Sequence, residues 1–403
     1  MDKRQTVLFA LLVFLLLFGS HFFEYGNWNY TLTGRFSYFL YAGIFCVSIY
    51  AFLRIPSIKL PLWWLPLLLA IGTFPAAVSR HLEYGEPLFD EIKNLIPFLS
   101  FSLFYLFYAS RLKLSTIMSA FTILGLVIFL IQIFQLIFPE AAIFGVEKKT
   151  SDFYGYIITD SRNNMFRYRM ESYMITIFCL YYYWTRALRK PTLRNVVLFA
   201  VFAISLYLYL TRQIIFSVLV TLLLSLILSK EVNLKVKIIL ILGAVFFLGF
   251  KFSGALFGSF VENFDTEISV DNVRVSAVLY YVPQIFKNPM VALFGNGHAD
   301  SFNEVMESDK IYPIDIGFIG EGVYYGLIWI LFYFVTVAII LIKYRKAVPE
   351  YVKLYVFGTF LNSILIFPYR NGYEVLVWTI VLYLSSVSIM LDKNKLNDSR
   401  CHS

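Results

Sequence analysis

The stretch NVVLFAVFAISLYLYLTRQIIFSVLVTLLLSLILS, residues 195–229, is apolar almost throughout and is interrupted at Thr211-Arg212-Gln213. One helix of this length would measure about 50 Å at about 1.5 Å per residue, whereas the hydrocarbon core of a bilayer is about 30 Å thick. We therefore expect two membrane-spanning helices joined by a tight turn, with Arg212 at its tip.

The rest of the chain has the same character. Of its 403 residues, 59% are hydrophobic and 15% are charged, whereas about a quarter of the residues of a soluble domain are charged. Such a chain must present its apolar exterior to lipid, which excludes soluble enzymes, secreted disulfide scaffolds and disordered regulators. The three cysteines (Cys46, Cys179 and Cys401) form no CxxC pair, so we expect neither a disulfide framework nor a metal site.

Apolar runs of about 20 residues predict twelve membrane-spanning helices in a single all-α membrane domain over 1–403. The first run lacks a small-residue cleavage site and is expected to be retained. The twelve runs cover about 6–23, 36–53, 61–79, 94–110, 115–138, 170–187, 195–211, 213–229, 236–253, 316–342, 351–368 and 373–391.

The positions of the charges orient these spans. With both termini in the cytoplasm, the inner connections and adjoining span ends hold 20 of the 34 Lys and Arg residues but only five of the 26 Asp and Glu residues. Cytoplasmic loops carry such an excess of Lys and Arg. The net charge of +8 is therefore a signal of topology, and we expect no nucleic-acid partner. The largest outer loop is then 254–315, and the next is 139–169.

Four arginines lie at the outer edges of predicted spans: Arg169, Arg212, Arg274 and Arg370. Each has a plain alternative role as an interfacial anchor or, for Arg169, in a surface arrangement with Glu171. Together they predict an anionic ligand, because a guanidinium group holds phosphate oxygens through two parallel hydrogen bonds. At the level of the lipid headgroups this ligand would be a lipid-linked phosphate or diphosphate.

Two further residues of the outer loops are candidates for substrate binding. Arg167 lies beside Arg169, and His298 follows the turn residues Gly295-Asn296-Gly297 in the large loop. The sequence contains no GxxxxGK[ST], HExxH or DxD motif, so we expect neither a metal nor a cofactor. A lipid diphosphate donor carries its own leaving group, and arginines offset its charge.

Three segments then follow one another in a recognisable order. The first is the basic turn Leu210-Thr211-Arg212-Gln213 between two spans. The second lies in the large loop, where Arg274 precedes Asn288-Pro289 and Leu293-Phe294-Gly295-Asn296-Gly297. The third is 315–328, which begins the tenth span. With about twelve spans and cytoplasmic ends, this order resembles the O-antigen polymerase/ligase superfamily of Wzy-type polymerases and WaaL-type ligases.

One position departs from the ligase pattern. Where the ligases begin the last segment with a His, this chain has Asp315 followed by Ile316. The resemblance therefore favours the polymerase branch. Asp315 is the expected general base, since a carboxylate that is partly buried at a helix start becomes more basic. Its alternative role is that of an N-cap of the tenth span.

The resemblance implies a metal-independent glycosyltransferase of the bacterial inner membrane. It would join oligosaccharide repeat units linked to undecaprenyl diphosphate at the periplasmic face, with Asp315, Arg212 and Arg274 as catalytic residues. Its partners would be the lipid-linked substrate and a chain-length regulator protein. The alternatives are a ligase-like transferase of lipid-linked glycans and, from another class, a flippase or solute transporter that performs no chemistry.

Overall fold

A computed structural model gives the structure of the chain. It describes residues 2–19, 26–54, 60–138, 159–162, 165–168, 173–209, 211–229, 237, 273–308, 311–364, 366–368 and 372–401. The helices of the first half are α1 (Lys3–Gly19), α2 (Gly26–Arg54), α3 (Trp64–Ile71), α4 (Phe74–Tyr84), α5 (Leu88–Leu95), the 3-10 helix η1 (Ile96–Ser102), α6 (Leu103–Ala109) and α7 (Leu114–Ile137).

The second half contains α8 (Tyr173–Arg189), α9 (Leu193–Leu208), α10 (Arg212–Leu228), α13 (Val273–Ile285), α14 (Pro289–Phe294), α15 (Asp300–Ser308), the 3-10 turn η2 (Pro313–Ile316), α16 (Gly317–Ala338), the π-helical turn η3 (Ile339–Lys343), α17 (Glu350–Asn362) and α18 (Gly372–Cys401). A short antiparallel hairpin of β1 (Thr159–Arg162) and β2 (Met165–Tyr168) departs from the all-α prediction in one loop.

Within the described residues, five helical segments are long and apolar enough to cross a membrane. Three shorter apolar helices accompany them: Tyr38–Arg54, Leu193–Leu208 and Gln213–Leu228. These features are those of an α-helical membrane protein. The count of twelve spans stays a prediction, and the predicted span 236–253 lies outside the described residues apart from Lys237.

The break predicted inside 195–229 is present. Helix α9 ends at Leu208 and α10 begins at Arg212, so that Arg212 is the first residue of a helix and Thr211 is its N-cap. Helix α9 packs on α7 and α8, whereas the principal partner of α10 is α17.

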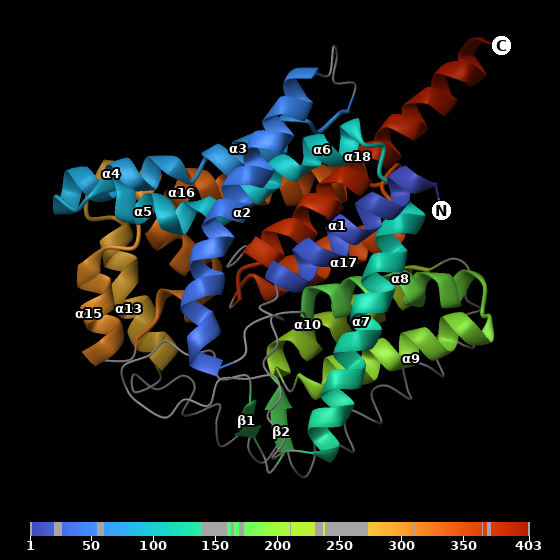
Figure 1. Cartoon of the computed structure of the whole chain (residues 1–403), viewed down its shortest axis with the longest axis horizontal. Helices are drawn as coiled ribbons and strands as arrows, with labels where there is room; N and C mark the ends of the chain where they lie inside the picture. Colours follow the sequence, from blue (N-terminus) through green and yellow to red (C-terminus); the bar gives the residue numbers. More distant parts are fainter. Residues whose placement is uncertain are drawn as a thin grey trace.

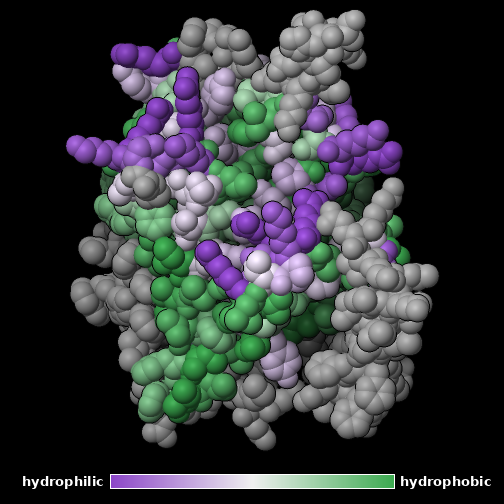
Figure 2. Space-filling model, turned by 90° about the vertical axis from the view of Figure 1, so that its right-hand side faces the viewer, coloured by the Kyte–Doolittle hydropathy of each residue, from purple (hydrophilic) through white to green (hydrophobic). Residues whose placement is uncertain are grey.

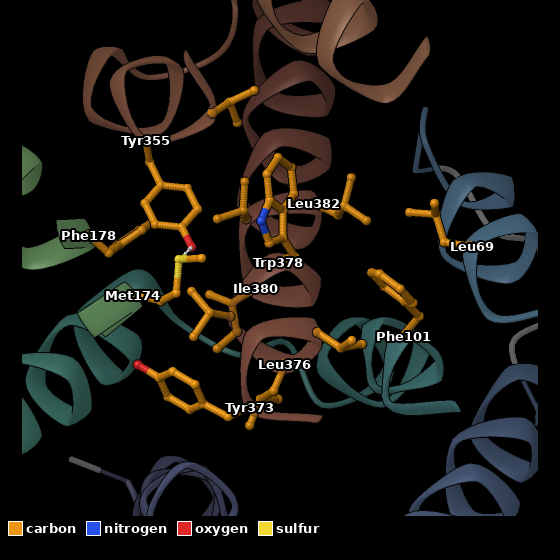
Figure 3. Packing of buried hydrophobic residues seen from close by; sticks show 14 of the residues in the cluster. Leu69, Phe101, Met174, Phe178, Tyr355, Tyr373, Leu376, Trp378, Ile380 and Leu382 are labelled. Carbon is orange, nitrogen blue, oxygen red and sulfur yellow. Dashed lines mark hydrogen bonds between the residues drawn. The ribbon is translucent and has the colours of Figure 1, made fainter. Parts of the chain in front are cut away.

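Helix α18 forms the centre of the core. Its side chains from Tyr373 to Leu384 are nearly all buried. Trp378 is fully buried, and the Tyr355 ring of α17 lies beside it (Figure 3). In the same layer the Tyr355 hydroxyl donates to the Met174 sulfur at 3.2 Å. A helix that is apolar on every side is stable where other helices cover all of its faces.

Connections that the charge pattern places on the inner face contact one another. The Arg4 guanidinium donates to the Ala109 carbonyl oxygen at 2.6 Å, the Gln5 amide donates to the Arg111 carbonyl oxygen at 3.1 Å, and Arg189 pairs with Glu350 at 3.1 Å. Both chain ends lie on the same side of the molecule as the α8–α9 connection (Figure 1). Hydrophilic residues gather in the upper and middle part of that face, and hydrophobic residues cover its lower left (Figure 2). The contacts of Arg4, Gln5 and Arg189 support the prediction that these connections lie together on one face. The cytoplasmic location of this face stays a prediction.

Candidate functional site

A break in α16 organises the site. Gly326 has φ 79° and ψ 169°, so the helix is interrupted there. The segment that follows α14 fills the break: the Asn296 N–H donates to the Val323 carbonyl oxygen at 2.7 Å, and the Gly297 N–H donates to the Tyr324 carbonyl oxygen at 2.9 Å. These are carbonyl groups that the break releases from the helical pattern, and such groups need partners away from water.

Two glycines make this contact geometrically possible. A Cβ atom at Gly295 would lie 2.3 Å from the Tyr324 carbonyl oxygen, and a Cβ atom at Gly326 would lie 2.3 Å from the Leu293 carbonyl oxygen. The loop backbone and the broken helix therefore approach each other more closely than any side chain allows, and both glycines adopt positive φ angles that favour glycine.

The beginning of the same loop is fastened to α4. The Asn288 side chain accepts from the Val291 N–H at 2.8 Å and so caps α14, while its amide donates to Glu83 at 2.7 Å. The Lys287 ammonium group lies 2.7 Å from the other oxygen of Glu83. Residues 287–297 thus form a docked turn that is held at both ends.

A cluster of charged side chains lies where this loop meets α4 and α5. Arg80 contacts three carboxylates: its Nη2 pairs with Glu86 and lies 3.4 Å from Asp300 Oδ1, and its Nη1 lies 3.5 Å from Glu91 Oε2. The side chain of Arg80 is 5% exposed, that of Glu91 is fully buried and that of Asp300 is 74% exposed. We call Arg80, Glu86, Glu91, His298 and Asp300 the Arg80 cluster.

Glu91 and His298 are joined by two contacts. The backbone N–H of His298 donates to Glu91 Oε2 at 2.8 Å, and the ring atom Nδ1 of His298 lies 2.9 Å from Glu91 Oε1. The His298 ring also stacks on Tyr324 with a centroid distance of 4.2 Å and an interplanar angle of 15°. The imidazole is therefore fixed between a carboxylate of α5 and an aromatic ring of α16.

The charge balance of the Arg80 cluster is unsuited to anion binding. One guanidinium group faces three carboxylates, so the cluster is acidic even when the His298 ring is protonated. Removing one partner of such a buried pair costs several kcal/mol, about 3–5, because the other charge stays buried without compensation. The cluster therefore cannot release Arg80 to bind a phosphate group at small cost.

A second group of candidate residues lies around the C-terminal end of α17. The Gln213 amide, next to Arg212, donates to the Asn362 carbonyl oxygen at 2.9 Å. The Phe318 N–H, three residues after Asp315, donates to the adjacent Ser363 carbonyl oxygen at 2.9 Å. The start of α10 and the start of α16 therefore meet at one point of the fold.

Helix α13, which carries Arg274, packs next to the same region. Its residues Ala277, Tyr281 and Ile285 are buried at helical spacing, and the helix packs on η2 and α16. The Tyr281 hydroxyl donates to the Ile311 carbonyl oxygen at 3.1 Å, and burial raises the pKa of this phenol, so it remains a donor. Arg274 itself is exposed near the start of the helix. The structure thus brings together the elements that carry Arg212, Arg274 and Asp315.

One expectation for Asp315 is wrong. It is half-buried in the 3-10 turn η2, and the N-cap of α16 is Ile316, which makes no side-chain capping bond. The reason is that Gly317, the first residue of α16, has φ 55°, so the chain changes direction between Asp315 and the rest of the helix.

The remaining predicted residues are described in part or not at all. Arg167 lies in β2, where its backbone pairs with Asp160, and its side chain is outside the described part of the structure. The side chain of Arg212 is likewise outside it. Arg169 and Arg370 lie wholly outside the described residues.

Sequence reasoning missed Arg80, Glu86 and Glu91. They lie in a short predicted outer connection, where charges are usually solvated. Their partner His298 is 207 residues from Glu91, and no spacing pattern connects the two segments. The one available signal was the density of charges in a connection that directly adjoins two apolar spans.

Comparison of the chain with protein-family models, with curated proteins and with solved structures finds no match. Within the described residues, no group of three or more His, Cys, Asp or Glu side chains has an arrangement that could hold a metal ion. What the site does is therefore argued from its own chemistry.

Proposed function

We propose that this protein is a membrane-embedded glycosyltransferase that joins lipid-linked oligosaccharide units at the outer face of the bacterial inner membrane. The growing chain on undecaprenyl diphosphate is the donor, and a sugar hydroxyl of the incoming lipid-linked unit is the acceptor. The oxygen of this hydroxyl attacks the anomeric carbon of the donor. The bond from that carbon to the diphosphate breaks, the lipid diphosphate leaves with the electron pair, and the hydroxyl proton passes to a base.

The observation that carries the proposal is the convergence at the end of α17. Arg212, Arg274 and Asp315 come from three distant parts of the sequence. The starts of α10 and α16 meet at Asn362 and Ser363, and α13 packs on η2, which directly precedes α16. Two arginines on elements that meet favour an anionic ligand, because each guanidinium group holds phosphate oxygens with a planar fork. Arg167, Arg169 and Arg370 are the further arginines predicted for the same ligand.

The base is one of two residues on this side of the molecule. Asp315 lies in η2, on which α13 with Arg274 packs, and there it would take the proton or bind an acceptor hydroxyl. The His298 ring stacks on Tyr324 of α16. Tyr324 is seven residues after Gly317, the first residue of the helix, so the two residues are about 10 Å apart along the helix axis. One lipid-linked oligosaccharide is long enough to contact both places.

A transporter is the second candidate function, and the Arg80 cluster beside a broken helix favours it. Buried ionisable groups and interrupted helices are common at the midplane sites of coupled transporters. However, the carbonyl groups of Val323 and Tyr324 at the break already accept from the Asn296 and Gly297 amides. At the other end of the cluster, Asp300 is exposed. Both observations favour a docked loop at the end of a span over an ion path through the membrane.

Deletion of the gene, followed by analysis of the cell's glycans, tests the proposal. A lost polymerase leaves products that carry a single repeat unit, and expression of the intact gene restores the ladder of longer chains. Lipid-linked polymer that fails to transfer to its final acceptor would identify a ligase instead. Accumulation of single lipid-linked units on the cytoplasmic side would identify a flippase.

A further inference from the structure

We infer that His298, held by Glu91, is the general base that takes the proton of the acceptor hydroxyl. This inference rests on the glycosyltransferase proposed above and decides between its two candidate bases. It makes His298 a catalytic residue and Glu91 a positioning residue.

The contacts between the two side chains determine which ring nitrogen is free. An ionised carboxylate only accepts hydrogen bonds, so the 2.9 Å contact of Glu91 Oε1 requires the proton to be on His298 Nδ1. In the neutral ring Nε2 then carries the lone pair. Among the described residues, no hydrogen-bond partner of Nε2 is found, and the side chain is 30% exposed. Glu91 thus fixes the orientation of the His298 ring, while part of the ring stays accessible to a substrate.

The charges around Glu91 and His298 suit a base that becomes a cation when it takes a proton. The buried Glu91 carboxylate stabilises the imidazolium ion that forms when Nε2 takes a proton, as the carboxylate of a catalytic triad does. Arg80 lies beside Glu91, and Glu86 and Asp300 in turn offset Arg80. From α16, the rings of Tyr324 and Tyr325 face His298.

The proton balance of the step is simple. His298 Nε2 takes the proton as the acceptor oxygen bonds to the anomeric carbon and the diphosphate departs with its electron pair. The imidazolium ion then gives the proton to water, which returns the ring to its starting state. An imidazole is suited to this role because it exchanges protons near neutral pH.

The substitution His298→Asn separates the catalytic role from a structural one. The amide nitrogen of Asn occupies the place of Nδ1 and still donates to Glu91, so the loop stays docked, but nothing replaces the base at Nε2. With purified protein in vesicles and lipid-linked repeat units as the substrate, we expect the turnover rate to fall by about 10²–10⁴-fold with little change in KM, the usual effect of losing a positioned base.

The matched control is His81→Asn. His81 is an exposed histidine of α4 whose Nδ1 contacts the Glu86 carbonyl oxygen at 2.8 Å, and we assign it no part in the reaction. It should polymerise at the wild-type rate. If His298→Asn does the same, the inference is overturned while the proposed function stands. If the wild-type protein makes no polymer, the proposed function fails and the inference fails with it.

Two further measurements keep the test decisive if His298→Asn accumulates poorly. Added imidazole should restore turnover to His298→Ala, which a purely structural histidine would not permit. Glu91→Gln should move the acidic limb of the rate–pH profile to lower pH, because the imidazolium ion loses its counter-charge. Absence of rescue together with an unmoved pH profile would overturn the inference.

Discussion

Of the three predicted catalytic residues, Arg274 and Asp315 are the two whose side chains the structure describes, and their surroundings differ. Arg274 is exposed near the start of α13, whereas Asp315 is half-buried in η2. The two residues should therefore respond differently to conservative substitution.

Arg274→Lys keeps the positive charge and removes the planar fork. We expect turnover to fall about 10- to 100-fold, which corresponds to the loss of a hydrogen bond to a charged group worth about 1.5–3 kcal/mol. The amount of folded protein should be unchanged because the side chain is exposed. Arg345→Lys is the control, since Arg345 is an exposed arginine of a connection that the charge pattern places on the inner face. Equal activity of both variants would reduce Arg274 to an anchor.

Asp315→Asn keeps a polar side chain of the same size but cannot take up a proton. If His298 is the base, the substitution weakens binding of the acceptor, so KM rises and the acidic limb of the rate–pH profile stays in place. Steady-state kinetics over a range of pH values distinguish the alternatives. A large loss of turnover with KM unchanged would make Asp315 the base.

At the scale of elements, the contact between the α14 loop and the break in α16 is the least tolerant part of the site. Gly326→Ala places a Cβ atom 2.3 Å from the Leu293 carbonyl oxygen and forces an alanine into a glycine conformation. We expect a loss of stability of about 1–3 kcal/mol from the backbone strain alone, and thermal unfolding in detergent measures it.

Gly322→Ala is the matched control in the same helix. A Cβ atom there meets its nearest neighbours at 3.7 Å, an ordinary contact. Because alanine favours a helix over glycine by about 1 kcal/mol, this variant should unfold at the wild-type temperature or above it. A Gly326→Ala protein that is equally stable would show that the break is not required.

At the scale of the whole molecule, the topology predicts which connections a reagent can reach from each side. In a background without native cysteines, Arg212→Cys should react with an impermeant thiol reagent added to the periplasm, because position 212 begins α10 on the predicted outer face. Lys190→Cys, in the α8–α9 connection, should react only after the membrane is permeabilised. Labelling of position 190 alone in intact cells would contradict the topology.

The sequence predicts the helices of this molecule much better than it predicts their contacts. The apolar runs locate the long helices, and their length alone predicts the break between Leu208 and Arg212. Periodicity does not predict the break at Gly326, because the residues around it are apolar on both sides and their pattern continues unchanged.

For the site, the turn residues Gly295-Asn296-Gly297 predict that His298 is a candidate. Its partner Glu91 could not be recognised, since a carboxylate near the end of a span is usually solvated and only the tertiary contact buries this one. The N-cap role of Asp315 failed for a local reason, because the chain changes direction at Gly317, which has a positive φ.

The wide separation of Glu91 and His298 in the sequence has a consequence for biosynthesis. At about 5–20 residues per second, the ribosome adds the 207 residues between them in about 10–40 s. During this interval the span that contains Glu91 is already made, and the loop that will bury the carboxylate does not yet exist. Arg80 and Glu86, made within seconds of Glu91, are the only other members of the Arg80 cluster present at that stage. Of these, only Arg80 is a cation, so it alone can offset the charge of Glu91 until the later part of the chain is made.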